Sequence, residues 1–175
     1  TDIGSAASYR EACRWKLEHL AGTEISGTVD IKNARIKGPL VIGHNVSIGK
    51  ESEVVGPVVL GNDTKIGKNV LIGPYTSIGS NCEIGDNTQI LSSYIYDEVK
   101  IGSGVAISGT IIDNNTSVED KTSLENGSVI GPRVLIKRGA TVHSVLIWPE
   151  VVVKSGAVVN KNMINPKFAS STKGS

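Results

Sequence analysis

The amino-acid sequence predicts a parallel β-helix built from hexapeptide repeats and preceded by one α-helix. Three observations support this fold class. Aliphatic residues recur about every six positions from residue 25 to residue 159, small residues follow most of them four positions later, and Asn, Asp or Gly stands between the two. A period of six matches neither an amphipathic helix, with a period of about 3.6, nor a single strand, with a period of about two. It is the period of hexapeptide β-helices.

The first predicted element is an α-helix in residues 5–20, SAASYREACRWKLEHL. Tyr9, Ala12, Cys13, Leu17 and Leu20 share one helical face. We expect the helix to cap the β-helix by packing on its first coil, because an uncovered terminal coil exposes apolar corners and unpaired strand edges. Residues 5–22 are therefore predicted to form a capping helix and linker, residues 23–166 the β-helix, and residues 167–175 a tail.

Each hexapeptide of residues 23–166 is predicted to be a short strand that ends in a sharp corner. The aliphatic residue fills a corner of the core, and the Asn, Asp or Gly three places later tolerates the left-handed backbone that a sharp corner needs. Three strands close one triangular coil, and neighbouring coils stack by parallel pairing about 4.8 Å apart. The segment is long enough for about eight coils, a prism on the order of 38 Å long.

One column of corners departs from the period. Steps of five residues lead from residue 90 to 95, from 107 to 112 and from 142 to 147, and three Gly-Pro pairs fall in the same column, at residues 38–39, 56–57 and 73–74. Either a partner packs along this edge of the prism, or the corner merely tolerates tight turns. Tyr94, Tyr96 and Trp148 lie in or beside the column. They are candidate interface residues.

Composition and charge argue against several classes of protein. The chain has 175 residues and a formal charge of +1, so its bulk charge gives no indication of nucleic-acid binding. No apolar run of about 18 residues and no signal peptide is visible, so we expect a cytoplasmic protein that does not bind a membrane. Cys13 and Cys82 are too few for a disulfide framework and lack metal-ligand spacing. Both are predicted to stay reduced.

The first residues resemble a motif of the sugar-1-phosphate nucleotidyltransferases, close to D-I-G-T-x-x-x-Y-x-x-A, which closes their catalytic domain. The matching residues are Asp2, Ile3, Gly4, Tyr9 and Ala12, whereas Ser5 stands in place of the usual Thr. Residues 147–159, IWPEVVVKSGAVV, resemble the last coils of mannose-1-phosphate guanylyltransferases and glucose-1-phosphate nucleotidyltransferases that carry a carboxy-terminal β-helix. The repeats also resemble the left-handed parallel β-helix, and the left hand is expected on that ground.

This resemblance implies that residues 1–4 are the remnant of a catalytic domain. The whole polypeptide would make an NDP-sugar from an NTP and a hexose-1-phosphate, with Mg²⁺ as cofactor and Asp2 as one of its ligands. The family's glycine-rich nucleotide loop and phosphate-binding lysine are missing here. We therefore expect the chain alone to be inactive, with no catalytic residue and no cofactor. Its expected tasks are assembly into a homo-oligomer, as a trimer or from dimers, orientation of the catalytic domain and effector binding.

Arg133, Lys137, Arg138 and Lys154 make the last coils basic and are candidates for an interface or for a phosphate-bearing effector. Two other functions stay open. A hexapeptide acyltransferase would use a histidine base on an acyl-CoA substrate, and His44 and His143 are the candidates within the repeats. A β-helix scaffold without enzymatic activity is the second alternative.

Overall fold

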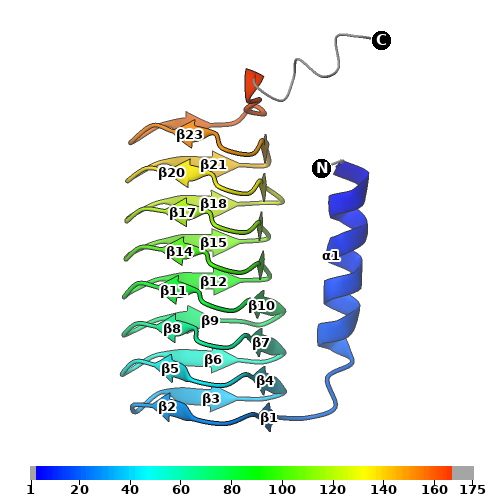
Figure 1. The fold of residues 1–175 in the computed structure, drawn as a ribbon, viewed down its shortest axis with the longest axis vertical. Coiled ribbons are helices and arrows are strands. Elements are labelled where there is room, and N and C mark those ends of the chain that lie inside the picture. The colour runs from blue at the N-terminus through cyan, green and yellow to red at the C-terminus, as the bar shows by residue number, and fades with distance from the viewer. Residues whose placement is uncertain (1–2, 167–175) are drawn as a thin grey trace.

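The computed structural model describes residues 3–166 as a triangular prism of stacked coils with one helix, α1 (Ile3–Glu18), at its side (Figure 1). The three sides of the prism are parallel sheets of eight strands each, so the predicted β-helix of about eight coils is confirmed. Asp2 and the predicted tail, 167–175, lie outside the described residues, as does half of the remnant predicted at residues 1–4. No helix in residues 3–166 is long and apolar enough to cross a membrane.

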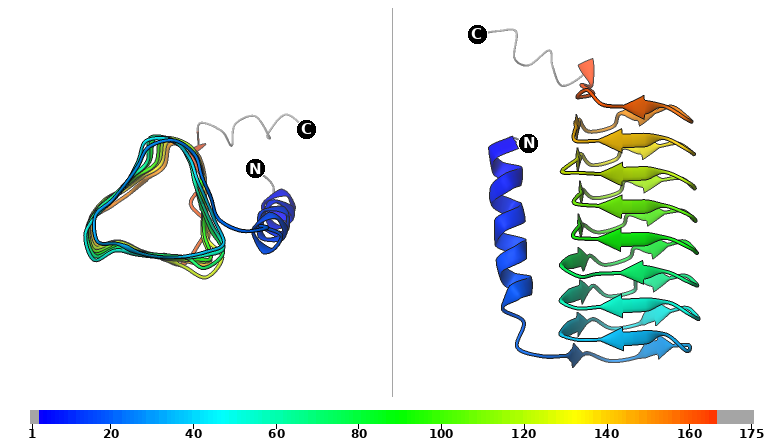
Figure 2. Two further views of the ribbon diagram at one scale, coloured as in Figure 1. Left: turned by 90° about the horizontal axis from the view of Figure 1, so that it is seen from below. Right: turned by 180° about the vertical axis from the view of Figure 1, so that it is seen from behind.

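The strands follow one another around the triangle, one from each sheet per coil (Figure 2). Sheet A contains β1 (Glu24–Ile25), β4 (Leu40–Ile42), β7 (Val58–Leu60), β10 (Thr76–Ile78), β13 (Tyr94–Ile95), β16 (Ile111–Ile112), β19 (Val129–Ile130) and β22 (Leu146–Ile147). Sheet B contains β2 (Val29–Ile31), β5 (Val46–Ile48), β8 (Lys65–Ile66), β11 (Glu83–Ile84), β14 (Lys100–Ile101), β17 (Ser117–Val118), β20 (Leu135–Ile136) and β23 (Val152–Val153). Sheet C contains β3 (Arg35–Lys37), β6 (Glu53–Val55), β9 (Leu71–Ile72), β12 (Gln89–Leu91), β15 (Ala106–Ser108), β18 (Ser123–Glu125), β21 (Thr141–His143) and β24 (Val158–Val159).

The core is the column of aliphatic residues that the repeat predicted. Ile72, Ile90 and Ile112 are fully buried, each covered by the equivalent residues of the coils on both sides. In the first coil, by contrast, Ile25 is 49% and Ile31 37% exposed, because no coil precedes it. The prism therefore has an open, apolar first end.

Buried hydroxyl groups link successive coils from inside. The Thr64 hydroxyl donates to the carbonyl oxygen of Gly79 at 2.7 Å and accepts from the N–H of Cys82 at 3.2 Å. Thr88 and Thr116 make the same pair of bonds further along. Among the described residues no buried side-chain nitrogen or oxygen atom is without a hydrogen-bond partner. The small inward residues of the repeat thus provide directional bonds as well as filling space.

Left-handed backbone turns the predicted corners. Asn45 and Asn81 both have φ of 56°, and Asn115 has φ of 62°. The irregular column is the corner from sheet C to sheet A, which we call the C–A corner, and its three Gly-Pro peptide bonds are cis. Shortening of this corner appears in the register of sheet A: Val59 pairs with Ser77, 18 residues on, whereas Ser77 pairs with Tyr94, 17 residues on.

The helix is confirmed, but its predicted position over the first coil is wrong. It lies along the outer face of sheet A and leaves the first end of the prism uncovered (Figures 1 and 2). The reason is the outward-facing column of sheet A, which is mostly apolar: Glu24, Val41, Val59, Ser77, Tyr94, Ile111, Val129 and Leu146. This column offers the apolar face of the helix a longer contact than the small triangular end of a coil.

Candidate functional surfaces

The contact between α1 and sheet A is a second hydrophobic cluster, separate from the core of the prism. Leu17 is 2% exposed and packs with Tyr94 and Ile111, and the partly buried Cys13 and Leu20 lie against the same cluster. The predicted helical face is therefore the contact face, except that Ala12 is exposed. The element that packs beside the C–A corner is the chain's own helix.

Three tyrosine rings, those of Tyr9, Tyr94 and Tyr96, lie against one another in this contact. The Tyr9 ring meets the Tyr94 ring edge-on, with centroids 6.3 Å apart, and lies 5.1 Å from the Tyr96 ring. Burial, followed by hydrogen bonding to Tyr96, raises the pKa of Tyr9 well above the ordinary range. Burial is also the main cause of the raised pKa values of Tyr94 and Tyr96. All three phenols therefore stay neutral at physiological pH.

Two arginines of α1, Arg10 and Arg14, also contact the prism. Arg10 donates through Nη2 to the carbonyl oxygen of Ser128 at 3.0 Å, and partial burial lowers the pKa of its guanidinium. The Arg14 guanidinium lies 5.0 Å from the centroid of the Tyr75 ring. These contacts determine the direction of the helix: Arg14 lies at Tyr75, in the turn before β10, whereas Arg10 reaches the turn before β19. The helix thus runs from the last coils toward the first.

The basic candidates lie on two different corners and do not form one cluster. Arg133 follows β19 at the corner from sheet A to sheet B and forms an ion pair with Glu150, 3.6 Å away. Lys137 and Arg138 follow β20, and Lys154 follows β23, at the corner from sheet B to sheet C. All three are exposed, and the backbone N–H of Arg138 donates to Glu119 at 3.0 Å.

Trp148 follows β22 directly, as Tyr96 follows β13, so the two aromatic residues occupy the same column three coils apart. Trp148 is partly buried against the core, and its backbone N–H donates to the carbonyl oxygen of Met163 at 2.9 Å. Of the three aromatic candidates, Tyr94 and Tyr96 contact α1, whereas Trp148 contacts the segment that follows β24.

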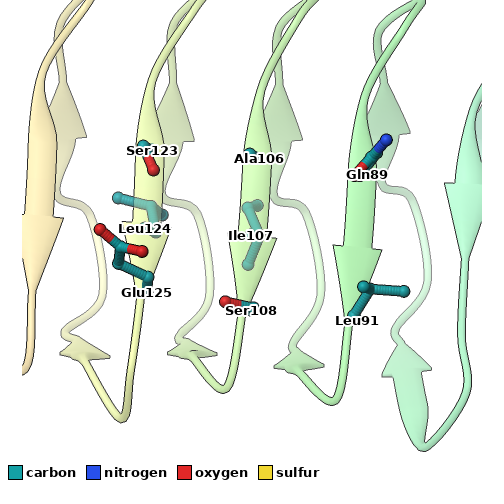
Figure 3. A pocket seen from close by; sticks show the side chains of 8 residues that line it. All are labelled: Gln89, Leu91, Ala106, Ile107, Ser108, Ser123, Leu124 and Glu125. Carbon is teal, nitrogen blue, oxygen red and sulfur yellow. The ribbon is translucent and has the colours of Figure 1, made fainter.

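The outer face of sheet C carries two shallow hollows that sequence reasoning missed. One, of about 190 Å³, has Ile107 and Leu124 among its lining residues and polar groups from Gln89, Ser108 and Glu125 (Figure 3). The other, of about 260 Å³, lies nearer the first coils between β3, β6 and β9. Small outward side chains such as Ala106 and Ser123 produce the first hollow, and a run of small residues at one outward position was its only signal in the sequence.

The two candidate histidines are far apart. His143, at the end of β21, has its Nδ1 atom 3.6 Å from Glu125 and 3.5 Å from the amide of Asn126. His44 lies in the corner after β4, in the second coil, where its backbone N–H donates to Asn62 at 2.7 Å. They cannot act on one substrate within one chain. No group of three His, Cys, Asp or Glu residues that could hold a metal ion occurs in residues 3–166.

The cysteines are free in the described structure. Cys82 is fully buried in the core, and burial raises the pKa of its thiol to about 11. A neutral, buried thiol is a weak nucleophile, so Cys82 is structural.

A family model described as the EIF2B subunit epsilon LbH domain, LbH standing for left-handed β-helix, matches residues 42–142. The chain is 18% identical to a hexapeptide transferase family protein from Anaplasma phagocytophilum, with a TM-score of 0.51 over 82% of this chain and 85% of that one. It is also 18% identical to LpxA from Acinetobacter baumannii, with a TM-score of 0.45 over 87% of this chain and 78% of that one. No curated protein matches in sequence. The likeness to the Anaplasma phagocytophilum structure concerns the fold alone, whereas the family match covers more than half of the sequence. The chain belongs to the family of the EIF2B subunit epsilon LbH domain, and its prism is a left-handed parallel β-helix.

Proposed function

We propose that this chain is the carboxy-terminal β-helix domain of a sugar-1-phosphate nucleotidyltransferase, joined to its catalytic domain through α1. The observation that carries the proposal is the place of Tyr9. The motif that resembles the end of the catalytic domain includes Tyr9, and this side chain packs on Tyr94 and Tyr96 of the prism. A motif that ends the catalytic domain and also contacts the prism is expected at the junction of the two domains.

The function of the domain would be to orient the catalytic domain and to assemble the enzyme. Arg14, Tyr9 and Arg10 hold α1 at three levels of sheet A, through Tyr75 before β10, Tyr94 of β13 and Ser128 before β19. A helix held at several points transmits the orientation of the prism to whatever precedes it, whereas a flexible linker does not. Assembly into a homo-oligomer, a cytoplasmic location and an effector on the basic corners belong to the same proposal.

The whole enzyme would take an NTP and a hexose-1-phosphate, with Mg²⁺ neutralising phosphate charge when bound. Mg²⁺ is usually held by one or two carboxylates together with substrate phosphates and water. Residues 3–166 contain no group of three His, Cys, Asp or Glu residues that could hold a metal ion, and Asp2, the proposed ligand, lies outside them. The Mg²⁺ site is therefore proposed for the whole polypeptide and not for the prism.

The test is an assay of pyrophosphate release with the polypeptide purified from its source cells and, separately, with the 175-residue chain. Each is given a panel of NTPs with mannose-1-phosphate or glucose-1-phosphate and Mg²⁺. We expect release from the source polypeptide and none from the 175-residue chain. Release by the short chain, or a source polypeptide that never releases pyrophosphate, would contradict the proposal.

One observation favours an acyltransferase as a second candidate function. His143 lies beside Glu125, and Glu125 also lines the first hollow on sheet C. A histidine next to a carboxylate is the usual arrangement of a general base. This candidate predicts micromolar binding of acetyl-CoA, weakened by His143→Ala and unchanged by the distant control His44→Ala. Calorimetry that detects no binding removes it, and the absence of both activities would leave the scaffold alternative.

A further inference from the structure

We propose that the domain preceding α1 packs against the last coils of the prism, at the end marked by Trp148 and Ile164. This inference rests on the proposed function, because that function places a catalytic domain before residue 1. The occupant is thus part of the same polypeptide, and the structure limits where it can lie.

The direction of α1 provides the first argument. Arg14 lies over the ring of Tyr75, in the turn before β10, whereas Arg10 bonds to Ser128, in the turn before β19. Ile3 lies seven residues before Arg10, which is about 10 Å along a helix or about two more coils. The helix therefore begins at the level of the last coils (Figure 1). The first coil lies about a helix length away, on the order of 24 Å.

Exposed apolar side chains at this end provide the second argument. Met163 forms a bridge with Ile147 of β22, so the segment after β24 lies on the side of the triangle that α1 flanks (Figure 2). The next residue, Ile164, is 58% exposed, and Trp148 is only partly buried nearby. Trp148 also stands in the column of Tyr96, which α1 contacts. The apolar strip under the helix thus continues beyond the beginning of the helix.

The hydrogen-bond donors and positive charges at this end of the prism indicate the chemistry of the surface that would pack against it. The N–H groups of Leu135, Lys137 and Thr141 donate to carbonyl oxygens of the following coil. By the same register, the N–H groups of Val152, Lys154 and Val158 face the open end, where no described strand follows. Lys154 and Lys161 are exposed there as well. The end is therefore rich in donors and basic, and fits a domain surface with acceptor oxygens, carboxylates and an apolar patch.

The test is carbodiimide coupling of lysines to carboxylates in the whole polypeptide, read by mass spectrometry. Lys154 and Lys161 probe the last coils, and the equally exposed Lys32 and Lys37 probe the first coils as a control within the molecule. A mixture of ¹⁴N- and ¹⁵N-labelled protein separates links within a chain from links between chains. We expect links within one chain from Lys154 or Lys161 to the preceding domain, and none from Lys32 or Lys37.

Three results overturn the inference: links to the preceding domain from Lys32 or Lys37, none from either end, or links at Lys154 and Lys161 only between copies. Pyrophosphate release is measured on the same sample. An active enzyme with the wrong links overturns this inference alone, whereas a polypeptide without activity overturns the proposed function.

A pair of variants checks the apolar part of the contact. Ile164→Lys adds a charge to the last end and Ile25→Lys adds one to the first end, where the side chain is 49% exposed. We expect Ile164→Lys to lower the yield of the Lys154 links at least threefold and Ile25→Lys to leave it unchanged. Equal yields in the two variants count against an apolar contact at Ile164. Circular dichroism verifies that both variants fold.

Discussion

The attachment of α1 to the prism depends on Leu17, the most buried side chain of the helix. Leu17 is 2% exposed against Tyr94 and Ile111. Leu17→Ala removes this burial and leaves a partly collapsible gap, so we expect the docking free energy of the helix to fall by about 2 to 3 kcal/mol. An isolated helix of this length is marginal in water, so an undocked α1 unfolds. The unfolded fraction of α1 should therefore rise about 30- to 150-fold.

Hydrogen exchange measures this change directly. Amides in the second half of α1 should exchange about 30- to 150-fold faster in Leu17→Ala, while those of β9 and β12 keep their rates. Trp15→Ala is the matched control, because Trp15 is 61% exposed and its ring stacks only on His19 of the same helix. It should alter helix exchange by less than about threefold. Equal effects of the two variants, or no effect of Leu17→Ala, would refute the assignment of Leu17 as the anchor.

Three other predictions concern the prism. Burial raises the pKa of the Cys82 thiol from 9.0 to about 11. As the pH rises, the unfolded chain therefore loses this proton at a lower pH than the folded chain. The free energy of unfolding should fall between these two pH values by up to about 1.4 kcal/mol per pH unit. Urea titrations should show a weaker pH dependence in Cys82→Ala. Thr64→Val removes the hydrogen bond to Gly79 and leaves the backbone N–H of Cys82 unpaired, so the free energy of unfolding should fall by about 1 to 3 kcal/mol in the same titrations. The control is Thr141→Val, whose side chain faces outward and which should lower the free energy of unfolding by less than about 0.5 kcal/mol. Asn81 has a left-handed backbone with φ of 56°, which a β-branched side chain disfavours and glycine tolerates. Thermal unfolding should therefore show a free energy of unfolding lower by about 1 to 2 kcal/mol in Asn81→Val and little changed in Asn81→Gly.

The repeat could be read from the sequence because each coil repeats the same short-range requirement. A buried aliphatic residue such as Ile72 and a left-handed corner such as Asn81 recur at fixed spacing, so the period alone predicted the sheets and the number of coils. The irregular C–A corner was visible for the same reason.

The place of α1 could not be read from the period of six, because docking is a long-range choice between surfaces. The relevant signal lies in every third hexapeptide, where the outward residue before the aliphatic one is apolar, as in Val59, Tyr94 and Val129. The equivalent outward residues of sheet B include Lys65, Glu83 and Lys100, which favour water. Sorting the repeats by sheet would have placed the helix on sheet A. The hollows on sheet C depend on small differences in side-chain size along one column, and those become visible only once the strands are aligned.

Because α1 lies along the prism, its length is related to the number of coils beside it. One coil adds about 4.8 Å to the prism, which equals the rise of about three helical residues. A coil gained or lost between β13 and β22 would shift the beginning of α1 by that amount relative to the last coil, unless about three residues entered or left the helix as well. Three residues also turn a helix by about 300°, which moves side chains such as Tyr9 and Arg10 around its axis. Coil number and helix length are therefore coupled, and a change in either one alone would alter the position from which the preceding part of the polypeptide departs.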